Sequence, residues 1–368
     1  MIRKILTLGL LFTCMAANSQ KTLHLLDPAA TYKTGIELFE KQKYSAARRS
    51  FEKVTSDPAF EQTEIKANAQ YYAALCALEL FNSDAEYMLA VFIHENPENS
   101  RQNEARFHMG RFQYSNKKYS KAVTWFAQVK PEALKEDQRH EYYFESGYSY
   151  FQEGDYEKAR VAFAEIKDID TKYTSPALYY YSHILYIQKN YESALTGFIR
   201  LKDDETFAPI VPYYISQIYF LQKKYDKVIE YAPSLLDSVT EKRMAEMSRI
   251  IGESYYKLDK FGEAIPYLEK YMDKAPAPTQ DDKYELAYSY YRTGDYKNAV
   301  KYFERISSAD NSVAQNALYH LGDCYIRLKE KNKARMAFSS ASKMNYSEDI
   351  KESALFNYAI VTYELSYS

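Results

Sequence analysis

The chain has 368 residues and a nearly even charge balance, with 48 Lys and Arg against 50 Asp and Glu. No block of like charge stands out along it, which excludes nucleic-acid binding through a basic face. Length alone would indicate two globular domains, but a repeated array has no such size limit and is the better interpretation.

Residues 1–19 are predicted to be a secretory signal peptide. A basic pair at 3–4, an apolar segment at 5–16 and small residues at 17–19 precede Gln20. This order is typical of signal peptides, here with cleavage before Gln20. The apolar segment is too short to span a membrane as a mature helix.

Export implies the periplasm or the outer face of the cell, with peripheral association with the envelope and no mature transmembrane helix in this chain. A lipoprotein attached through Cys14 stays open as an alternative, because residues 11–14 loosely resemble a lipobox. Residues 20–27 are interpreted as a linker.

From residue 28 onward one pattern recurs. Around Tyr156, a small residue (Gly147) lies nine positions before the aromatic anchor, Ala159 three after it and Phe163 seven after it. The anchors that show this pattern are Tyr44, Tyr119, Tyr156, Tyr191, Tyr225, Phe261 and Tyr296, with weaker copies centred on Asn82 and Lys331. From Tyr119 to Tyr296, neighbouring anchors are 34 to 37 residues apart. Such a period is typical of stacked helical hairpins, none of which can bury its apolar face alone.

The small residues predict where the two helices of a hairpin approach each other, because a larger side chain would push them apart. In the first helix of each hairpin they are Gly35, Gly110, Gly147, Gly252 and Gly322, with Ala73, Ser182, Ser216 and Ala287 as equivalents. In the second helix they include Ala47, Ala85, Ala122, Ala159, Ala194, Ala264, Ala299 and Ala334.

This pattern resembles the tetratricopeptide repeat family over residues 28–368. The resemblance implies an all-α fold, a right-handed superhelical solenoid of antiparallel helix hairpins, with nine full repeats and the first helix of a tenth. The repeats are expected to start near residues 28, 66, 103, 140, 175, 209, 245, 280, 315 and 352. No polar capping element is visible at the end, which suggests a fragment or a chain that leans on another chain.

The sixth repeat departs most from the pattern. It has Pro212 in its first helix, Val228 in place of alanine and Pro233 in its second helix. An interior proline removes a hydrogen bond and clashes with the preceding turn, so a broken or bent second helix is predicted. A hinge in the array and a tolerated local irregularity are both open.

In this family the first helices line the inner, concave face, so the resemblance implies a partner-binding surface there. Twelve residues before the anchors lie Phe107, Phe144, Tyr179, Tyr213 and Tyr284. Eight before lie Arg111, Tyr148, His183, Gln217 and Tyr288, and five before lie Tyr114, Phe151, Tyr186 and Tyr291. The aromatic rows either pack neighbouring hairpins together or line a groove for a peptide.

Three cations, Lys257, Arg292 and Arg327, recur four residues before their anchors. They would meet either an acidic partner or the nearby carboxylates of Glu253 and Asp323, in a network balanced within the chain.

No pattern indicates catalysis, a cofactor or a metal. No two histidines have the i, i+4 spacing of a helical metal site, and there is no Cys-x-x-Cys, phosphate loop or nucleophile elbow. The acidic pair Asp281–Asp282 is interpreted as a helix N-cap. Cys76 and Cys324 belong to distant repeats and are predicted to be free, buried thiols.

The sequence therefore predicts an exported, non-catalytic scaffold of the cell envelope that binds proteins or peptides along its inner face. Two alternatives remain. One is a glycan-binding envelope protein with sugars stacked on the aromatic rows. The other is a sensor or assembly head of a longer chain.

Overall fold

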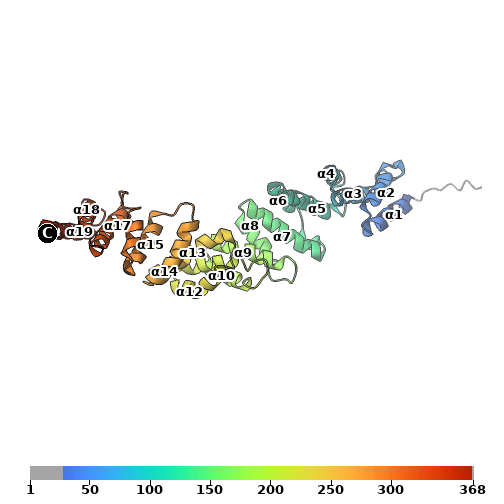
Figure 1. Ribbon diagram of the computed structural model, residues 1–368. Helices are drawn as coiled ribbons and strands as arrows, with labels where there is room; N and C mark the ends of the chain where they lie inside the picture. Colours follow the sequence, from blue (N-terminus) through green and yellow to red (C-terminus); the bar gives the residue numbers. More distant parts are fainter. Residues whose placement is uncertain (1–27, 367–368) are drawn as a thin grey trace, which may run out of the picture. The chain divides into compact units, whose positions relative to one another are not determined.

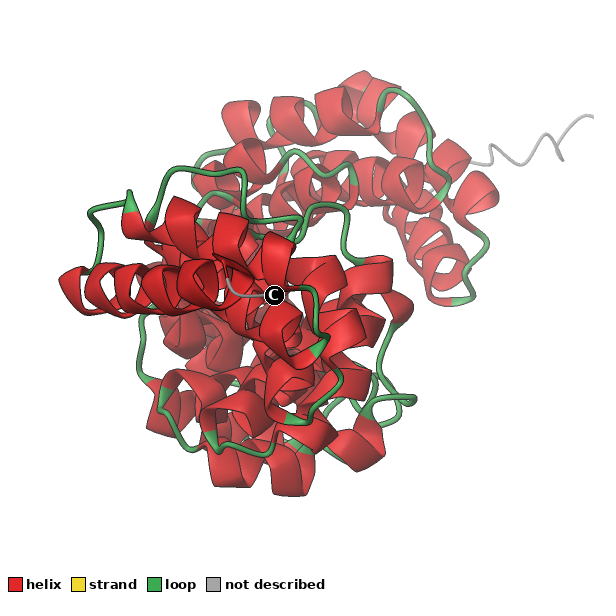
Figure 2. Cartoon of the chain, turned by 60° about the vertical axis from the view of Figure 1, so that its left-hand side comes forward, coloured by secondary structure: helices red, strands yellow, loops and turns green. Residues whose placement is uncertain are grey.

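The computed structural model describes residues 28–366 and contains helices joined by loops, without a β-strand in that range (Figure 2). The predicted all-α fold is confirmed. The predicted signal peptide and the linker lie outside the described residues.

The chain divides into two compact units, the first ending at Ala177 and the second beginning at Leu178. The helices of the first unit are α1 (Pro28–Glu40), α2 (Tyr44–Ser56), α3 (Glu64–Glu79), α4 (Ala85–Glu95), α5 (Gln102–Ser115), α6 (Tyr119–Phe126), α7 (Glu136–Gln152) and α8 (Tyr156–Ala164). Short 3-10 helices, η1 (Pro58–Phe60) and η2 (Pro131–Ala133), stand between hairpins. Helix α9 (Thr174–Ile187) contains the division (Figure 1).

The second unit continues the same alternation of helices. It comprises α10 (Tyr191–Arg200), α11 (Val211–Leu221), α12 (Tyr225–Tyr231), η3 (Pro233–Leu235), α13 (Glu241–Lys257), α14 (Phe261–Lys274), α15 (Gln280–Arg292), α16 (Tyr296–Phe303), α17 (Ser312–Arg327), α18 (Lys331–Ser342) and α19 (Glu348–Ser366). Over residues 28–366 the α-helices thus follow one another as nine pairs and one further helix, α19. In pairs such as α5–α6, α13–α14 and α17–α18 the two members pack against each other.

The turn between the two helices of a pair depends on one residue in the left-handed region. Its φ is +79° at Gly154 and +84° at Gly294, in the two Gly-Asp-Tyr turns. Non-glycine residues such as Lys117, with φ 57°, take this conformation in the other pairs. The left-handed residue ends the first helix and reverses the chain, and Asp155 then caps the next helix by accepting from the Lys158 N–H.

Except in the sixth repeat, which has Ala232 at the large position, the core of each described hairpin is a small residue that faces a large one. A Cβ added at Gly110 would lie 2.5 Å from a ring carbon of Phe126, and one at Gly322 would lie 2.6 Å from Phe338. The large side chains at this position, all at most 2% exposed, are Phe51, Leu89, Phe126, Phe163, Phe198, Leu268, Phe303 and Phe338. The second-helix alanines beside them, all 0% exposed, include Ala47, Ala122, Ala159, Ala264, Ala299 and Ala334. The helices approach closely because no side chain separates them.

The second repeat corrects one sequence alignment. Ala74, and not the predicted Ala73, belongs to the same cluster as Leu89 of its own hairpin, while Ala73 packs with Phe51 of the first repeat. The turn after α3 is one residue shorter than the others, counted from its left-handed residue Phe81 to Ala85. A missing residue shifts the register of the whole first helix.

The sixth repeat has the predicted interruption. Helix α12 ends at Tyr231, and a 3-10 turn begins at Pro233, which has no N–H to continue the helix. Pro212, in contrast, lies in the first turn of α11, where a missing N–H costs no hydrogen bond.

The predicted N-cap at Asp281–Asp282 is placed differently. Thr279 is the N-cap of α15, and its side chain accepts from the N–H of Asp282, whose carboxylate in turn accepts from the N–H of Thr279. The two aspartates lie in the first turn, where the helix dipole favours negative charge.

Candidate functional site

The aromatic residues twelve positions before the anchors lie between helices. Phe144 stacks on Tyr173 with ring centroids 5.1 Å apart. Phe107 is 0% exposed and Tyr213 is 7% exposed. Both side chains are buried in the core, and their role in partner binding stays a prediction. The half-buried members of the row are Phe144, Tyr179 and Tyr284.

The aromatic residues five positions before the anchors have a common contact. Each packs against the anchor ring of its own repeat, with centroid separations between 5.6 and 6.1 Å. They are Tyr114, Phe151, Tyr186 and Tyr291, and all four are half-buried. These rings hold the two helices together beside the turn, so packing accounts for much of this row.

The row eight positions before the anchors varies in chemistry. Arg111 forms an ion pair with Glu141 at 2.9 Å, so its charge is balanced within the first unit. His183 stacks between Tyr179 and Tyr186, and burial lowers the pKa of its imidazole. The remaining members, Tyr148, Gln217 and Tyr288, are half-buried.

The three cations four positions before the anchors differ from one another. Lys257 lies 2.9 Å from Glu285, and Arg327 lies 3.7 Å from Asp323. Arg292 is exposed and has no ion pair with a described carboxylate. Its guanidinium lies 4.5 Å from the centroid of the Phe261 ring. Of the three, Arg292 alone has no ion pair within the described residues.

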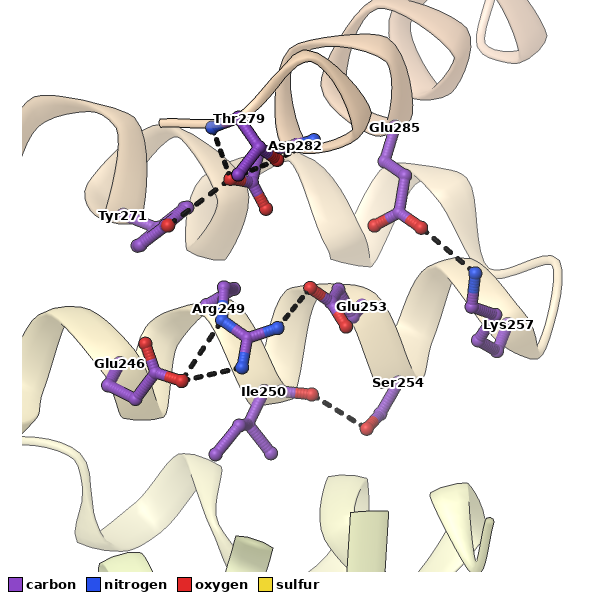
Figure 3. A network of polar contacts seen from close by, with 10 residues as sticks. All are labelled: Glu246, Arg249, Ile250, Glu253, Ser254, Lys257, Tyr271, Thr279, Asp282 and Glu285. Atoms are coloured by element: carbon purple, nitrogen blue, oxygen red, sulfur yellow. Dashed lines mark hydrogen bonds and ion pairs between the residues drawn. The ribbon is translucent and has the colours of Figure 1, made fainter. Parts of the chain in front are cut away.

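Figure 3 shows a polar network on α13 and α15 in the second unit. Arg249 forms ion pairs with two carboxylates of its own helix. It lies 2.5 Å from Glu246 and also contacts Glu253. Arg249 lies twelve residues before Phe261, where most repeats have an aromatic ring. This replacement is a sequence signal that marks the polar segment of the wall, and the sequence prediction missed it.

Glu285 is the carboxyl of this network that burial affects most. Its side chain is 12% exposed, and it accepts from the Lys257 ammonium at 2.9 Å. Burial raises the pKa of Glu285 to about 7, and the Lys257 hydrogen bond opposes that rise. A lysine contributed by the preceding repeat therefore holds a glutamate that would otherwise be isolated.

Glu145 is the corresponding carboxyl of the first unit. Like Glu285, it lies nine residues before a left-handed glycine, here Gly154. Glu145 is 9% exposed, its Oε2 atom is buried without a hydrogen-bond partner, and neither carboxyl oxygen has an ion pair among the described residues. Burial raises the pKa of Glu145 to about 8, helped by the nearby Glu141.

The raised pKa predicts a pH-dependent stability. In the unfolded chain the Glu145 carboxyl has its ordinary pKa of 4.5. Between pH 4.5 and about 8 the unfolded state has therefore released a proton that the folded state keeps. Stability from this group therefore falls as the pH rises through that window. Glu145→Gln removes this pH dependence. The melting temperature of the variant minus that of the wild type is therefore expected to increase progressively from pH 5 to pH 8.

The full effect is on the order of a few kcal/mol at the alkaline end of this window. Thermal melts followed by circular dichroism at several pH values measure it. The exposed Glu153, just after α7, gives the control variant Glu153→Gln. A constant difference between Glu145→Gln and the wild type across the window would contradict the prediction.

The histidines and cysteines of the first helices are buried or half-buried. Within residues 28–366 no group of three His, Cys, Asp or Glu is placed to hold a metal. Burial lowers the pKa of His108 to about 3 and that of His320 to about 4, so both imidazoles are neutral at physiological pH. Cys76 and Cys324 are buried free thiols, as predicted, and burial raises the pKa of each to about 12.

The helices formed by residues 28–366 are all too short or too polar to span a bilayer.

Two stretches of the chain match known protein families. Residues 140–173, which include most of α7 and all of α8, match the tetratricopeptide repeat. Residues 263–341 match the family described as anaphase-promoting complex, cyclosome, subunit 3. These matches support the resemblance of the chain to the tetratricopeptide repeat family. The fold of this family suggests a scaffold for protein–protein interaction, and its members are generally non-catalytic. No curated protein matches the chain.

Several solved structures are similar to the chain. YrrB, described as a tetratricopeptide repeat protein with an unusual peptide-binding site, is 17% identical over 53% of this chain and 98% of its own, with a TM-score of 0.46. The C-terminal part of a repeat protein from Cytophaga hutchinsonii is 16% identical over 68% of this chain and 98% of its own, with a TM-score of 0.45. A tetratricopeptide repeat protein from Parabacteroides merdae is 15% identical over 80% and 98%, with a TM-score of 0.36. These likenesses concern the fold alone.

Proposed function

We propose that this protein is an exported, non-catalytic scaffold that binds a partner protein along the first helices of its repeats. The repeated hairpins support the scaffold role, because each adds one more first helix to the row of first helices within its unit. The signal-peptide pattern of residues 1–19 supports export to the periplasm or the outer membrane.

The single observation that carries the proposal is the arrangement at Arg292. Its guanidinium lies over the rings of Phe261 and Tyr288, at 4.5 and 5.7 Å from their centroids. It donates one hydrogen bond, 3.2 Å long, to the Tyr288 hydroxyl. A cation held in place by aromatic rings, exposed and without an ion pair, is suited to an acidic group on a partner.

Arg292→Glu is therefore expected to weaken capture of the partner by about five- to ten-fold without unfolding the protein. The loss has two causes, the missing stacked guanidinium and repulsion of an acidic partner. Capture is measured by crosslinking in intact cells, purification of the exported protein and quantitative mass spectrometry of the crosslinked species.

The control is Lys297→Glu, an equal charge reversal at an exposed position of α16 in the same repeat. It is expected to capture the same partner as the wild type. Equal recovery with Arg292→Glu, or no reproducible protein partner for the wild type, would remove the support for a scaffold that binds through this wall.

A further inference from the structure

Two junctions between repeats, one in each unit, have the same arrangement of aromatic rings. In the first unit, Tyr148 of α7 lies edge-on to Tyr114 at 5.9 Å and to Tyr119 at 5.6 Å. In the second unit, Tyr288 of α15 lies edge-on to Tyr256 at 6.0 Å and to Phe261 at 5.7 Å. Each of these rings occupies the same position relative to the left-handed residue of its turn. The two junctions are therefore structurally equivalent.

The equivalence extends to the buried glutamate but not to its partner. In the second unit the Lys257 ammonium lies 2.9 Å from Glu285 and 5.1 Å from the centroid of Tyr256. Lys257 lies two residues before its left-handed residue, and in the first unit that position is Ser115. Glu145 therefore occupies the place of Glu285 in a junction that lacks the lysine.

The place that an ammonium group would take is accessible from solvent. The Lys257 side chain is 41% exposed although Glu285 beneath it is 12% exposed. In the first unit Ser115 is exposed, and Glu145 is 9% exposed with one carboxyl oxygen buried and without a partner. The position that Lys257 takes in the second unit thus corresponds to a solvent-exposed residue, Ser115, in the first.

The charged and titratable neighbours of Glu145 leave its carboxyl without a direct partner. Arg111 is paired with Glu141, and Lys172 lies over the ring of Tyr173, 4.9 Å from its centroid. Burial raises the pKa of the phenols of Tyr114, from α5, and Tyr173, and the charge of the nearby Glu145 adds to both rises. The charges of Arg111 and Glu141 offset each other, so an ammonium group that approaches Glu145 meets a carboxyl without an ion pair.

We propose that Glu145 binds the primary ammonium group of a lysine side chain from the partner protein, at the position that Lys257 takes beside Glu285. The ring of Tyr114 supplies the aromatic face that Tyr256 supplies in the second unit. This inference rests on the proposed function for the source of the lysine, but the site itself is tested with a peptide and without the partner.

The probe is the blocked peptide acetyl-Gly-Lys-Gly-amide, titrated into the full chain by isothermal calorimetry. The expected result is binding of this peptide and none of its norleucine analogue, which has the same chain length without the amine. At pH 7 binding is expected to release protons, because Glu145 must ionise to pair with the ammonium. Calorimetry in two buffers of different ionisation enthalpy measures that release.

Ser115→Lys supplies the missing lysine from within the chain and is expected to weaken peptide binding about ten-fold or more. Glu145→Gln is expected to do the same and to abolish the proton release. The control Ser120→Lys adds the same charge at an exposed position of α6 and is expected to bind as the wild type does. Circular dichroism verifies that each variant is folded.

Equal binding of the lysine and norleucine peptides would overturn the proposal. So would unchanged binding in Ser115→Lys, since the peptide would then bind at a place other than Glu145. If a partner is captured in cells but the protein does not bind the lysine peptide, the scaffold function is supported and the Glu145 site is rejected. If the protein binds the lysine peptide but no partner is captured, the Glu145 site is supported and the scaffold function is not.

Discussion

Phe163→Ala is expected to lower the free energy of unfolding by about 3–5 kcal/mol, the cost of emptying a well-packed aromatic site. The Phe163 ring is 0% exposed and lies where α7 and α8 meet. A Cβ at Gly147 would lie 3.0 Å from it, and its centroid is 6.0 Å from that of Phe144. The cavity cannot close by collapse, because helix backbone lies on one side of it and an aromatic ring on the other.

Denaturant titration followed by circular dichroism measures this loss, with the midpoint as the primary readout because two compact units need not unfold in one step. The control is Val161→Ala in the same helix, whose side chain is 57% exposed. Its effect is expected to stay within about 0.5 kcal/mol. Similar midpoints for the two variants would show that the α7–α8 interface is not the packed core described above.

Gly322→Ala is expected to destabilise the protein by about 1–3 kcal/mol, although alanine normally favours a helix over glycine by about 0.5–1 kcal/mol. The added Cβ would lie 2.6, 2.7 and 2.8 Å from three carbons of the Phe338 ring. Phe338 is 2% exposed, so the ring has no free space to move into. The overlap must be relieved by separating α17 from α18.

Gly262→Ala gives a control of the same chemistry with the opposite expected sign. Gly262 is exposed in α14, and the nearest atom to an added Cβ would be the Thr293 methyl carbon at 3.9 Å. The helix preference of alanine should then raise the melting temperature slightly. Thermal melts of both variants decide the matter, and a stabilised Gly322→Ala protein would contradict the close approach of the two helices.

The hairpins could be predicted from the sequence because their constraints are local and repeat. A glycine nine residues before an aromatic anchor and a phenylalanine seven after it mark the two sides of one interface, as at Gly110 and Phe126. Pro233 could be interpreted in the same way, since a missing N–H ends α12 whatever surrounds it.

Register and proline tolerance could not be predicted where the surroundings decide them. The turn after α3 is one residue shorter than the others, and the amino-acid composition of this segment does not indicate it. As a result Ala74, and not Ala73, packs with Leu89 of its own hairpin. Pro266 lies inside α14 without ending it, in contrast to Pro233. Both Pro266 and Gly262, four residues earlier, are exposed, so water can satisfy the carbonyl that the proline leaves unbonded.

The burial and pairing of the residues on the first helices could not be predicted from their spacing. The spacing placed Phe107 on the same helix face as Arg111, but the structure buries Phe107 and pairs Arg111 with Glu141. Glu145 and Glu285 lie one position outside the rows chosen from the family pattern. An acidic residue on the apolar face of a first helix was the signal that could have identified them.

The sequence by itself determined the helical hairpins, their period and the small–large pairs that close them, because these depend on side-chain size at fixed separations along one chain. Only the tertiary structure decided which polar groups are paired. Glu285 forms an ion pair with Lys257 of the preceding repeat, whereas Glu145 has no ion pair among the described residues. The difference depends on one residue of the preceding repeat, 28 to 30 positions earlier, which is Lys257 in one case and Ser115 in the other. Burial and charge balance are properties of neighbours in space, and a pattern along the chain does not contain them.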